Sequence, residues 1–297
     1  MNKKKPTFVQ RFLDWWNPVR VFGFVVGALG ISISVFGVVY TGQFAHDIVQ
    51  AFYANVGTEC MSIAVTIVVI DWLYERRDAK RERERLVREM RNPDNGIALM
   101  AVEELRAGGW LDSAALLSGK YLWDANLQDV RLPGVLMRRT FLNRANLQRA
   151  NLDQADLEAA HLERANLCGA HLDKANLQSA DMRLTDLTGA RLMRANLKHA
   201  HLHGALLSGA DLNEADLTGA QVTDKELSQA DRLHGALMMD GSRYDGRYNL
   251  LGDVAAARGN AAGVDAAVMA AYYGIEVERY EQGQAWARSQ PQSAPIS

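Results

Sequence analysis

From Ala145 to Asp224 the chain repeats itself every five residues, sixteen times, with no insertion or deletion. Alanine opens fifteen of these pentads, where only Thr185 departs, and leucine takes the third place in fourteen, with Met182 and Val222 as the exceptions. A unit this short cannot bury its apolar side chains by itself, so each pentad must pack against its neighbours. The repeat therefore predicts a solenoid of stacked units.

A period of five suits neither regular secondary structure. On an α-helix, leucines five residues apart would drift around the axis, and on a flat strand they would alternate between the two faces. The pattern is explained if each pentad is a short extended stretch followed by a turn. Alanine and leucine then share the inward face. We expect truncation of inward Leu172 or Leu177 to destabilise the fold, and outward Asp173 and Gln178 to tolerate alanine.

The residue between alanine and leucine is Asn or Asp in ten of the sixteen pentads. The resulting A-[DN]-L-x-x run resembles the pentapeptide-repeat family, and weaker pentads extend it upstream to Ala115. The resemblance implies an all-β fold, a right-handed quadrilateral β-helix (pentapeptide-repeat solenoid) with four pentads in each coil. The 22 pentads would make about five and a half coils, roughly 25 Å tall at a strand spacing of about 4.8 Å.

Two apolar stretches precede the solenoid. Residues 21–40 are uncharged and long enough to span a bilayer as a helix, and residues 56–73 are nearly as long but include Glu59 and Asp71. Lys and Arg flank both stretches, whereas the connection 41–55 has none. This asymmetry predicts a two-helix transmembrane hairpin in an integral protein of the bacterial inner membrane, with both termini in the cytoplasm. A cleaved signal peptide is the less favoured alternative, because the apolar run is too long and lacks a cleavage site.

Two features of the hairpin suggest further roles. Small residues follow one face of its first helix, which predicts close packing within the hairpin or, as the alternative, a homodimer through this helix; they are Gly23, Gly27, Gly30, Ser34 and Gly37. Glu59 would be costly in hydrocarbon, so it is either functional in moving protons or buried only shallowly at the outer boundary.

Composition divides the chain into five segments. They are a cytoplasmic N-terminal segment (1–20), the transmembrane hairpin (21–73), a charged helical linker (74–110), the solenoid (111–224), and a C-terminal cap with a disordered tail (225–297). The basic excess of the linker predicts contact with anionic membrane lipid. In the cap, helical patterns run from about Val264 to Tyr273 and from Ile275 to Arg288, which predicts a small helical cap.

No motif of an enzyme is found in the sequence, so it predicts no catalytic residue and no cofactor. One group of residues has side chains that can bind metal, and four pentads per coil would align some of them in one column: His161, Asp181, His199, His201 and His203. They could bind zinc or nickel, but an open convex wall offers no second shell of support. Ordinary surface variation explains them as well, so no metal site is predicted.

Two classes of function remain. The favoured one is a membrane-anchored, non-enzymatic scaffold that presents a rigid solenoid to an unknown cytoplasmic protein, with no nucleic acid as partner. The alternative is a regulator of a topoisomerase or another nucleic-acid enzyme, because some soluble members of the resembled family protect DNA gyrase by imitating duplex DNA with a strongly anionic rod. The strict repeat holds 11 acids and 7 bases, a net charge of only −4, which disfavours mimicry.

Overall fold

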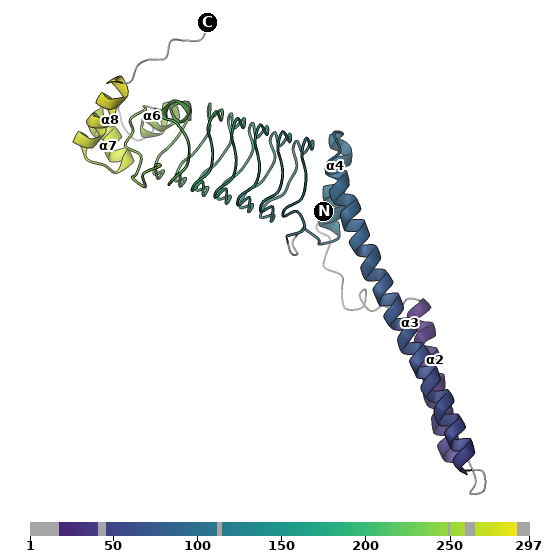
Figure 1. The fold of residues 1–297 in the computed structure, drawn as a ribbon. Helices are drawn as coiled ribbons and strands as arrows, with labels where there is room; N and C mark the ends of the chain where they lie inside the picture. Colours follow the sequence, from purple (N-terminus) through teal and green to yellow (C-terminus); the bar gives the residue numbers. More distant parts are fainter. Residues whose placement is uncertain (1–17, 41–45, 112–114, 249, 259–264, 290–297) are drawn as a thin grey trace. The chain divides into compact units, whose positions relative to one another are not determined.

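The computed structural model describes residues 18–40, 46–111, 115–248, 250–258 and 265–289 (Figure 1). The chain divides between Glu82 and Arg83 into two compact units. The first holds helix α2 (Pro18–Tyr40) and most of helix α3 (His46–Glu89). The second holds the end of α3, helix α4 (Asn95–Ala107), the repeats and the C-terminal helices. Each unit is described by itself.

In the first unit, α2 packs antiparallel against α3 through small residues. A Cβ atom on Gly23 would lie 3.1 Å from Cγ2 of Val68, and one on Gly27 would lie 3.3 Å from Cβ of Ala64. Residue numbers rise along α2 as they fall along α3, so the two helices run in opposite directions. The prediction that Gly23 and Gly27 pack within the helix pair is confirmed, while Ser34 and Gly37 lie outside the described side chains.

None of the helices, as far as their residues are described, is both long and apolar enough to cross a membrane. In α3 the apolar stretch is interrupted by Glu59 and Asp71, and from Glu75 onward the helix is densely charged. Charged side chains at such intervals are costly in hydrocarbon. The predicted transmembrane hairpin and the predicted localisation as an integral membrane protein are therefore contradicted.

In the second unit, the end of α3 and α4 cover the first coil of the repeats. Met90, the residue directly after α3, and Leu105 of α4 are fully buried in one cluster with Leu117 and Leu122. Asp94 caps α4 by accepting the backbone N–H groups of its first turn. This helical cover keeps the end of the apolar core out of water.

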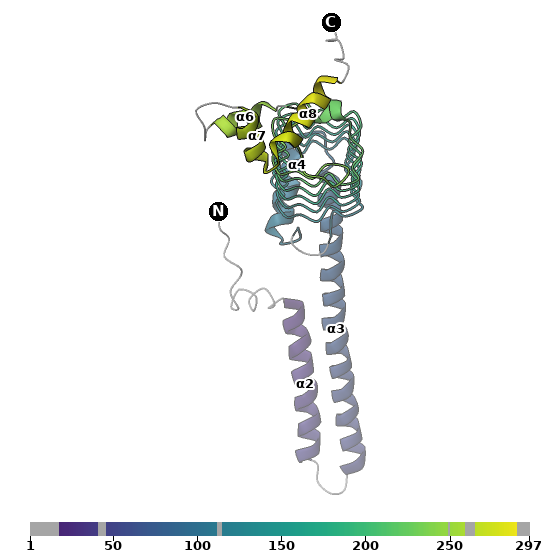
Figure 2. The ribbon, with the colours of Figure 1, turned by 90° about the vertical axis from the view of Figure 1, so that its left-hand side faces the viewer.

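The repeats form a solenoid whose coils take four pentads each. Isolated parallel bridges join residues 20 apart, from Tyr121 with Phe141 to His201 with Gln221, and the coils have a square outline seen end-on (Figure 2). Alanine and leucine of the pentads are buried from Ala145 to Leu217, which confirms their predicted inward placement. Burial of this stack supplies the main stabilisation.

The predicted fold class, an all-β solenoid behind a transmembrane hairpin, is nevertheless contradicted. The described repeats form only isolated bridges and no strand, and the regular secondary structure of the described chain is helical. The reason is the length of the pentad. Each turn follows so soon after the last that only one residue per pentad bridges to the next coil.

The turns set the corners of the coil. The fifth residue of most pentads has a positive φ, as in Arg149 at 54° and Ala159 at 53°. In several pentads the Asn or Asp in the second place, between alanine and leucine, accepts the backbone N–H two residues later, as Asn146 Oδ1 does from Gln148 at 3.2 Å. This Asx turn fixes the corner. The side chains in the second place of these pentads are therefore half-buried parts of the turn.

The far end of the solenoid is covered by helices α5 (Asp224–Leu227), α6 (Leu251–Arg258), α7 (Ala266–Tyr273) and α8 (Val277–Ser289). The helical patterns predicted in the cap are confirmed by α7 and α8, although Val264 lies outside the described residues. Tyr244 and, in the first turn of α6, Asp253 are buried in this cap. Oδ2 of Asp253 accepts the Leu233 N–H at 3.1 Å and the Tyr273 hydroxyl at 3.0 Å.

Candidate interaction site

One side of the solenoid carries stacked aromatic rings in place of the Asn and Asp of other pentads. We call this side the aromatic face and define it by residues 119–124, 139–144 and 159–164. Tyr121, Phe141 and His161 follow one another in a single column, because parallel bridges join each to the next. The ring centroids of Tyr121 and Phe141 are 4.6 Å apart, and those of Phe141 and His161 are 4.5 Å apart with nearly parallel planes. They form a continuous stack along the solenoid.

Trp123 stands at right angles to this stack. Its ring lies 5.6 Å from that of Tyr121 at 89° and 6.1 Å from that of Phe141 at 76°. Edge-to-face pairs of this kind are stabilising. Even so, 59% of Tyr121 and 42% of Trp123 remain exposed to solvent. Large exposed aromatic groups on a regular scaffold indicate a binding surface.

A groove of about 400 Å³ opens beside Trp123. Its lining combines rings with polar groups and comprises Trp123, Asp124, Phe141, Asn143, Arg144 and His161. The groove exists because Asn143, a short residue, occupies the place one coil after Trp123. Rings flanked by hydrogen-bonding side chains can hold an apolar group and orient its polar neighbours.

The charges around the aromatic face are unequal. Nε of Arg144 lies 3.0 Å from a carboxylate oxygen of Asp124, so this pair is neutral. Arg139 and Arg164 are exposed, and neither forms an ion pair with any residue that the structure describes. Glu163 lies 3.4 Å from Arg183 of the next coil. The edges of the face therefore carry cations that are available to a ligand.

The predicted column of His161, Asp181 and His201 exists, because bridges join these residues in that order. Within the described parts of the chain, however, no three His, Cys, Asp or Glu residues lie close enough to hold a metal ion. The ring of His161 stacks on Phe141, and two nitrogens of Arg183 donate to the Asp181 carboxylate at 2.7 Å. These hydrogen bonds lower the pKa of Asp181.

The other two histidines weighed for metal binding lie apart from this column. His199 occupies a corner with a φ of 57°, and Nδ1 of His203 lies 3.9 Å from Glu226. Glu59, the other residue singled out in the sequence, is exposed on α3 in the first unit. His199, His203 and Glu59 all lie outside the aromatic face.

The acids of the solenoid are largely paired with bases. Oδ1 of Asp129 lies 2.7 Å from Arg149, and Oε2 of Glu214 lies 2.8 Å from Arg194. The hydrogen bonds in these pairs lower the pKa of each carboxyl group. Further pairs also link neighbouring coils and join Arg138 to Asp156, Arg191 to Asp173 and Lys198 to Asp216. A solenoid neutralised in this way lacks the unbroken negative field of a duplex.

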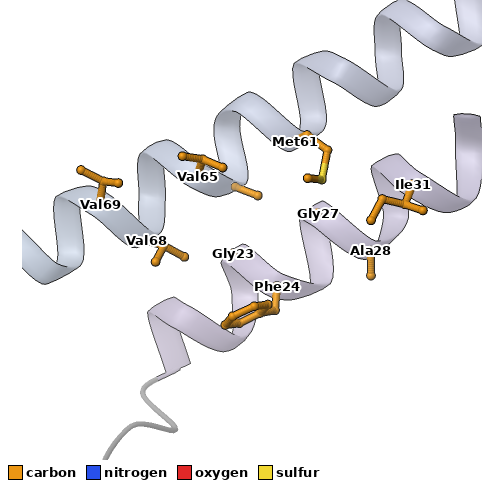
Figure 3. Close-up of a pocket in the computed structure, with 10 residues that line it drawn as sticks. Gly23, Phe24, Gly27, Ala28, Ile31, Met61, Val65, Val68 and Val69 are labelled. Atoms are coloured by element: carbon orange, nitrogen blue, oxygen red, sulfur yellow. The ribbon is translucent and has the colours of Figure 1, made fainter.

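A second hollow lies between α2 and α3 in the first unit and has a volume of about 420 Å³ (Figure 3). Only apolar side chains and glycines line it, among them Phe24, Met61 and Val68. Without a hydrogen-bonding group, nothing in its wall would orient a ligand. We therefore take the aromatic face as the candidate site.

Sequence reasoning missed this site. The sequence analysis noted the pentads with Asn or Asp in the second place but assigned no role to the pentads that have another residue there. The available signal was the spacing of Tyr121, Phe141 and His161, which are 20 residues apart and so share a column when a coil takes four pentads. Trp123 follows two residues after the first of them.

Comparison with known proteins supports the resemblance of the repeats to the pentapeptide-repeat family. Residues 125–163, 150–189 and 190–224 match the family model of pentapeptide repeats. No curated protein sequence matches significantly. The solved structures that match include the pentapeptide repeat protein Rfr23 from the cyanobacterium Cyanothece 51142, with 30% identity over 42% of this chain and 90% of that one and a TM-score of 0.21.

Two further structures match with lower identity. One is a pentapeptide repeat protein from the Arabidopsis thaliana thylakoid lumen, with 26% identity over 42% of this chain and 81% of that one and a TM-score of 0.26. The other is QnrB1, a plasmid-mediated fluoroquinolone resistance protein, with 18% identity over 46% of this chain and 82% of that one and a TM-score of 0.28. Through its repeats, which match the family model over residues 125–224, the chain belongs to the pentapeptide-repeat family.

Proposed function

We propose that the protein is a non-enzymatic scaffold whose solenoid binds another protein through the aromatic face. The observation that carries this proposal is the exposure of two large aromatic side chains, Tyr121 and Trp123, beside a groove. Aromatic residues are enriched at the centres of protein–protein interfaces, where they supply much of the binding energy. Leu136, Leu184 and Leu206 are also exposed on the repeats, but they carry no aromatic ring.

The solenoid is well suited to this task because the face is rigid before binding. Each ring is fixed by its neighbours in the column, and the backbone beneath is tied to the next coil, as Leu142 N–H is to His161 O at 2.7 Å. A preorganised surface loses little conformational entropy when a partner binds. The scaffold therefore needs no ordering of its own residues on binding.

Site-specific photo-crosslinking tests the proposal. A photoreactive phenylalanine analogue in place of Tyr121 should form a covalent adduct with a distinct protein in living cells. The matched control places the analogue at Met193, more than three coils farther along and on another side of the solenoid, where no adduct is expected. Equal adducts from both positions, or none from Tyr121, would contradict the proposal.

A further inference from the structure

We infer that the partner presents an acidic, short linear segment with one aromatic or large apolar side chain that fills the groove beside Trp123. This inference rests on the proposed function and adds the chemistry of the partner. It follows from three properties of the aromatic face: the cations along its edges, the size of the groove, and the way in which the rings are stacked.

The cations lie on both corners that border the ring column. Arg139 occupies the corner before Phe141, and Arg144 and Arg164 occupy the corner after it, one coil apart; their φ values are 54°, 60° and 58°. With Lys120, four basic residues lie on the face, against Asp124 and Glu163 as its acids. Both acids lie within 4 Å of an arginine. The face thus has a positive excess, which selects a partner of opposite charge and speeds its association.

The groove limits how the partner binds. Its volume of about 400 Å³ is at the small end of ligand pockets and admits one large side chain. A helix lying in a groove would need several apolar anchors along its length. On this face one ring lies outside the groove, that of Tyr121, and it belongs to the stack. A short segment with a single anchor, flanked by carboxylates that reach Arg139 and Arg164, fits the arrangement.

The stacking argues against single-stranded nucleic acid, which is also attracted by aromatic and basic surfaces. Bases bind such surfaces by stacking on the open faces of aromatic rings. Here both faces of the Phe141 ring are covered, since Tyr121 and His161 stack on either side at 4.6 Å and 4.5 Å. Phe141 at the centre of the stack is therefore closed to a base and can offer only its ring edge, which suits side-chain contact better than base stacking.

Selection from a random displayed peptide library against the full chain tests the inference. We expect enriched peptides to combine several Asp or Glu residues with one Trp, Phe or Leu. Their affinity, measured by fluorescence anisotropy, should fall by about tenfold or more with Trp123→Ala, equivalent to about 1.4 kcal/mol. Arg139→Ala and Arg164→Ala should each weaken binding and reduce its dependence on salt.

Matched controls lie on other sides of the solenoid. Lys174→Ala removes an exposed corner cation, and Leu206→Ala truncates an apolar side chain that is half exposed. Both should bind the enriched peptides as the unaltered chain does. All five substituted side chains are exposed, so equal thermal unfolding of the variants would show that folding is not the cause of a loss.

Several outcomes would overturn the inference. They are a basic or uncharged consensus, no enrichment at all, affinities that the arginine and Trp123 variants leave unchanged, or tighter binding of a single-stranded oligonucleotide that the same variants abolish. The proposed function has its own test. Adducts formed at Tyr121 without enrichment of acidic peptides would refute only the partner chemistry, whereas absence of adducts would refute the scaffold.

Discussion

At the scale of the residue, the second place of the pentad has a structural role. Asn196 Nδ2 donates to Asn176 Oδ1 at 3.0 Å one coil before, while its own Oδ1 accepts the Lys198 N–H at 3.2 Å. The side chain of Asn196 therefore serves both the turn and the hydrogen bonds between coils. Where Tyr121 and Phe141 replace Asn or Asp, the side chain is released from this role. Departures from the consensus are thus the positions at which function can be sought.

The expectation that Asp173 tolerates alanine needs revision for the same reason. Oδ1 of Asp173 accepts the Met193 N–H at 3.1 Å, and its carboxylate also binds Arg191. We expect Asp173→Ala to lower the free energy of unfolding by about 1 kcal/mol. Leu172→Ala, which empties part of the core, should lower it by about 2–5 kcal/mol. Chemical denaturation measures both, and equal losses would mean that the core does not dominate stability.

Asp253 predicts a pH dependence of the C-terminal cap. Burial raises the pKa of its carboxyl group above the ordinary 3.8, and Oδ1 accepts no hydrogen bond from the described residues. The folded state therefore holds this proton more tightly than the unfolded state, so stability falls as pH rises from about 3.8 through the raised pKa. Asp253→Asn cannot titrate.

The advantage of Asp253→Asn over the unaltered chain should accordingly grow as the pH is raised from 4 to 7. Near-ultraviolet circular dichroism follows the transition, because Tyr244 and Tyr273 are buried in the cap. Asp240→Asn is a suitable control, since the exposed Asp240 has a pKa lowered by its hydrogen bonds with Ser242. An advantage that shrinks as pH rises would contradict the assignment.

At the scale of the element, the corner of the pentad stores a small strain. Ala159 has a φ of 53°, in the left-handed region that costs an L-residue about 1–2 kcal/mol. Glycine relieves this cost but loses more entropy on folding. We expect Ala159→Gly to raise the free energy of unfolding by up to about 1 kcal/mol. Ala160→Gly, in the buried place one residue on, should lower it; stabilisation by both would refute the corner assignment.

The helix pair of the first unit can be tested by a disulfide. Cβ atoms at Gly27 and Ala64 would be 3.3 Å apart, close to the roughly 3.5–4.5 Å of natural disulfides. With Cys60 and Cys168 replaced by serine, Gly27→Cys and Ala64→Cys should form a bond within one chain under mild oxidation. Leu29→Cys paired with Ala64→Cys should not, because Leu29 is exposed. A bond between two chains would instead support the homodimer predicted as the alternative.

At the scale of the whole molecule, the sequence predicts the inward core well and the surface poorly. The period of five determines which residues face inward, because alanine and leucine must share a side. It does not say which outward residues meet, since that depends on the number of pentads in a coil. The stack of Tyr121, Phe141 and His161 appears only once residues 20 apart are aligned. The prediction of a transmembrane hairpin in the first unit was wrong because it gave the length of the apolar stretches more weight than the charges of Glu59 and Asp71.

Mimicry of duplex DNA makes a demand on the whole solenoid that these charges do not meet. A mimic must present a continuous negative field, and its binding to a DNA-handling enzyme must weaken steeply as salt rises. Here Asp129, Asp156 and Glu214 are each paired with an arginine. We expect the full chain to leave the supercoiling activity of DNA gyrase unchanged at low and at high salt. Inhibition that is relieved by neutralising Asp211, Glu214, Asp216 and Asp224, but not by Trp123→Ala, would establish mimicry in place of the scaffold.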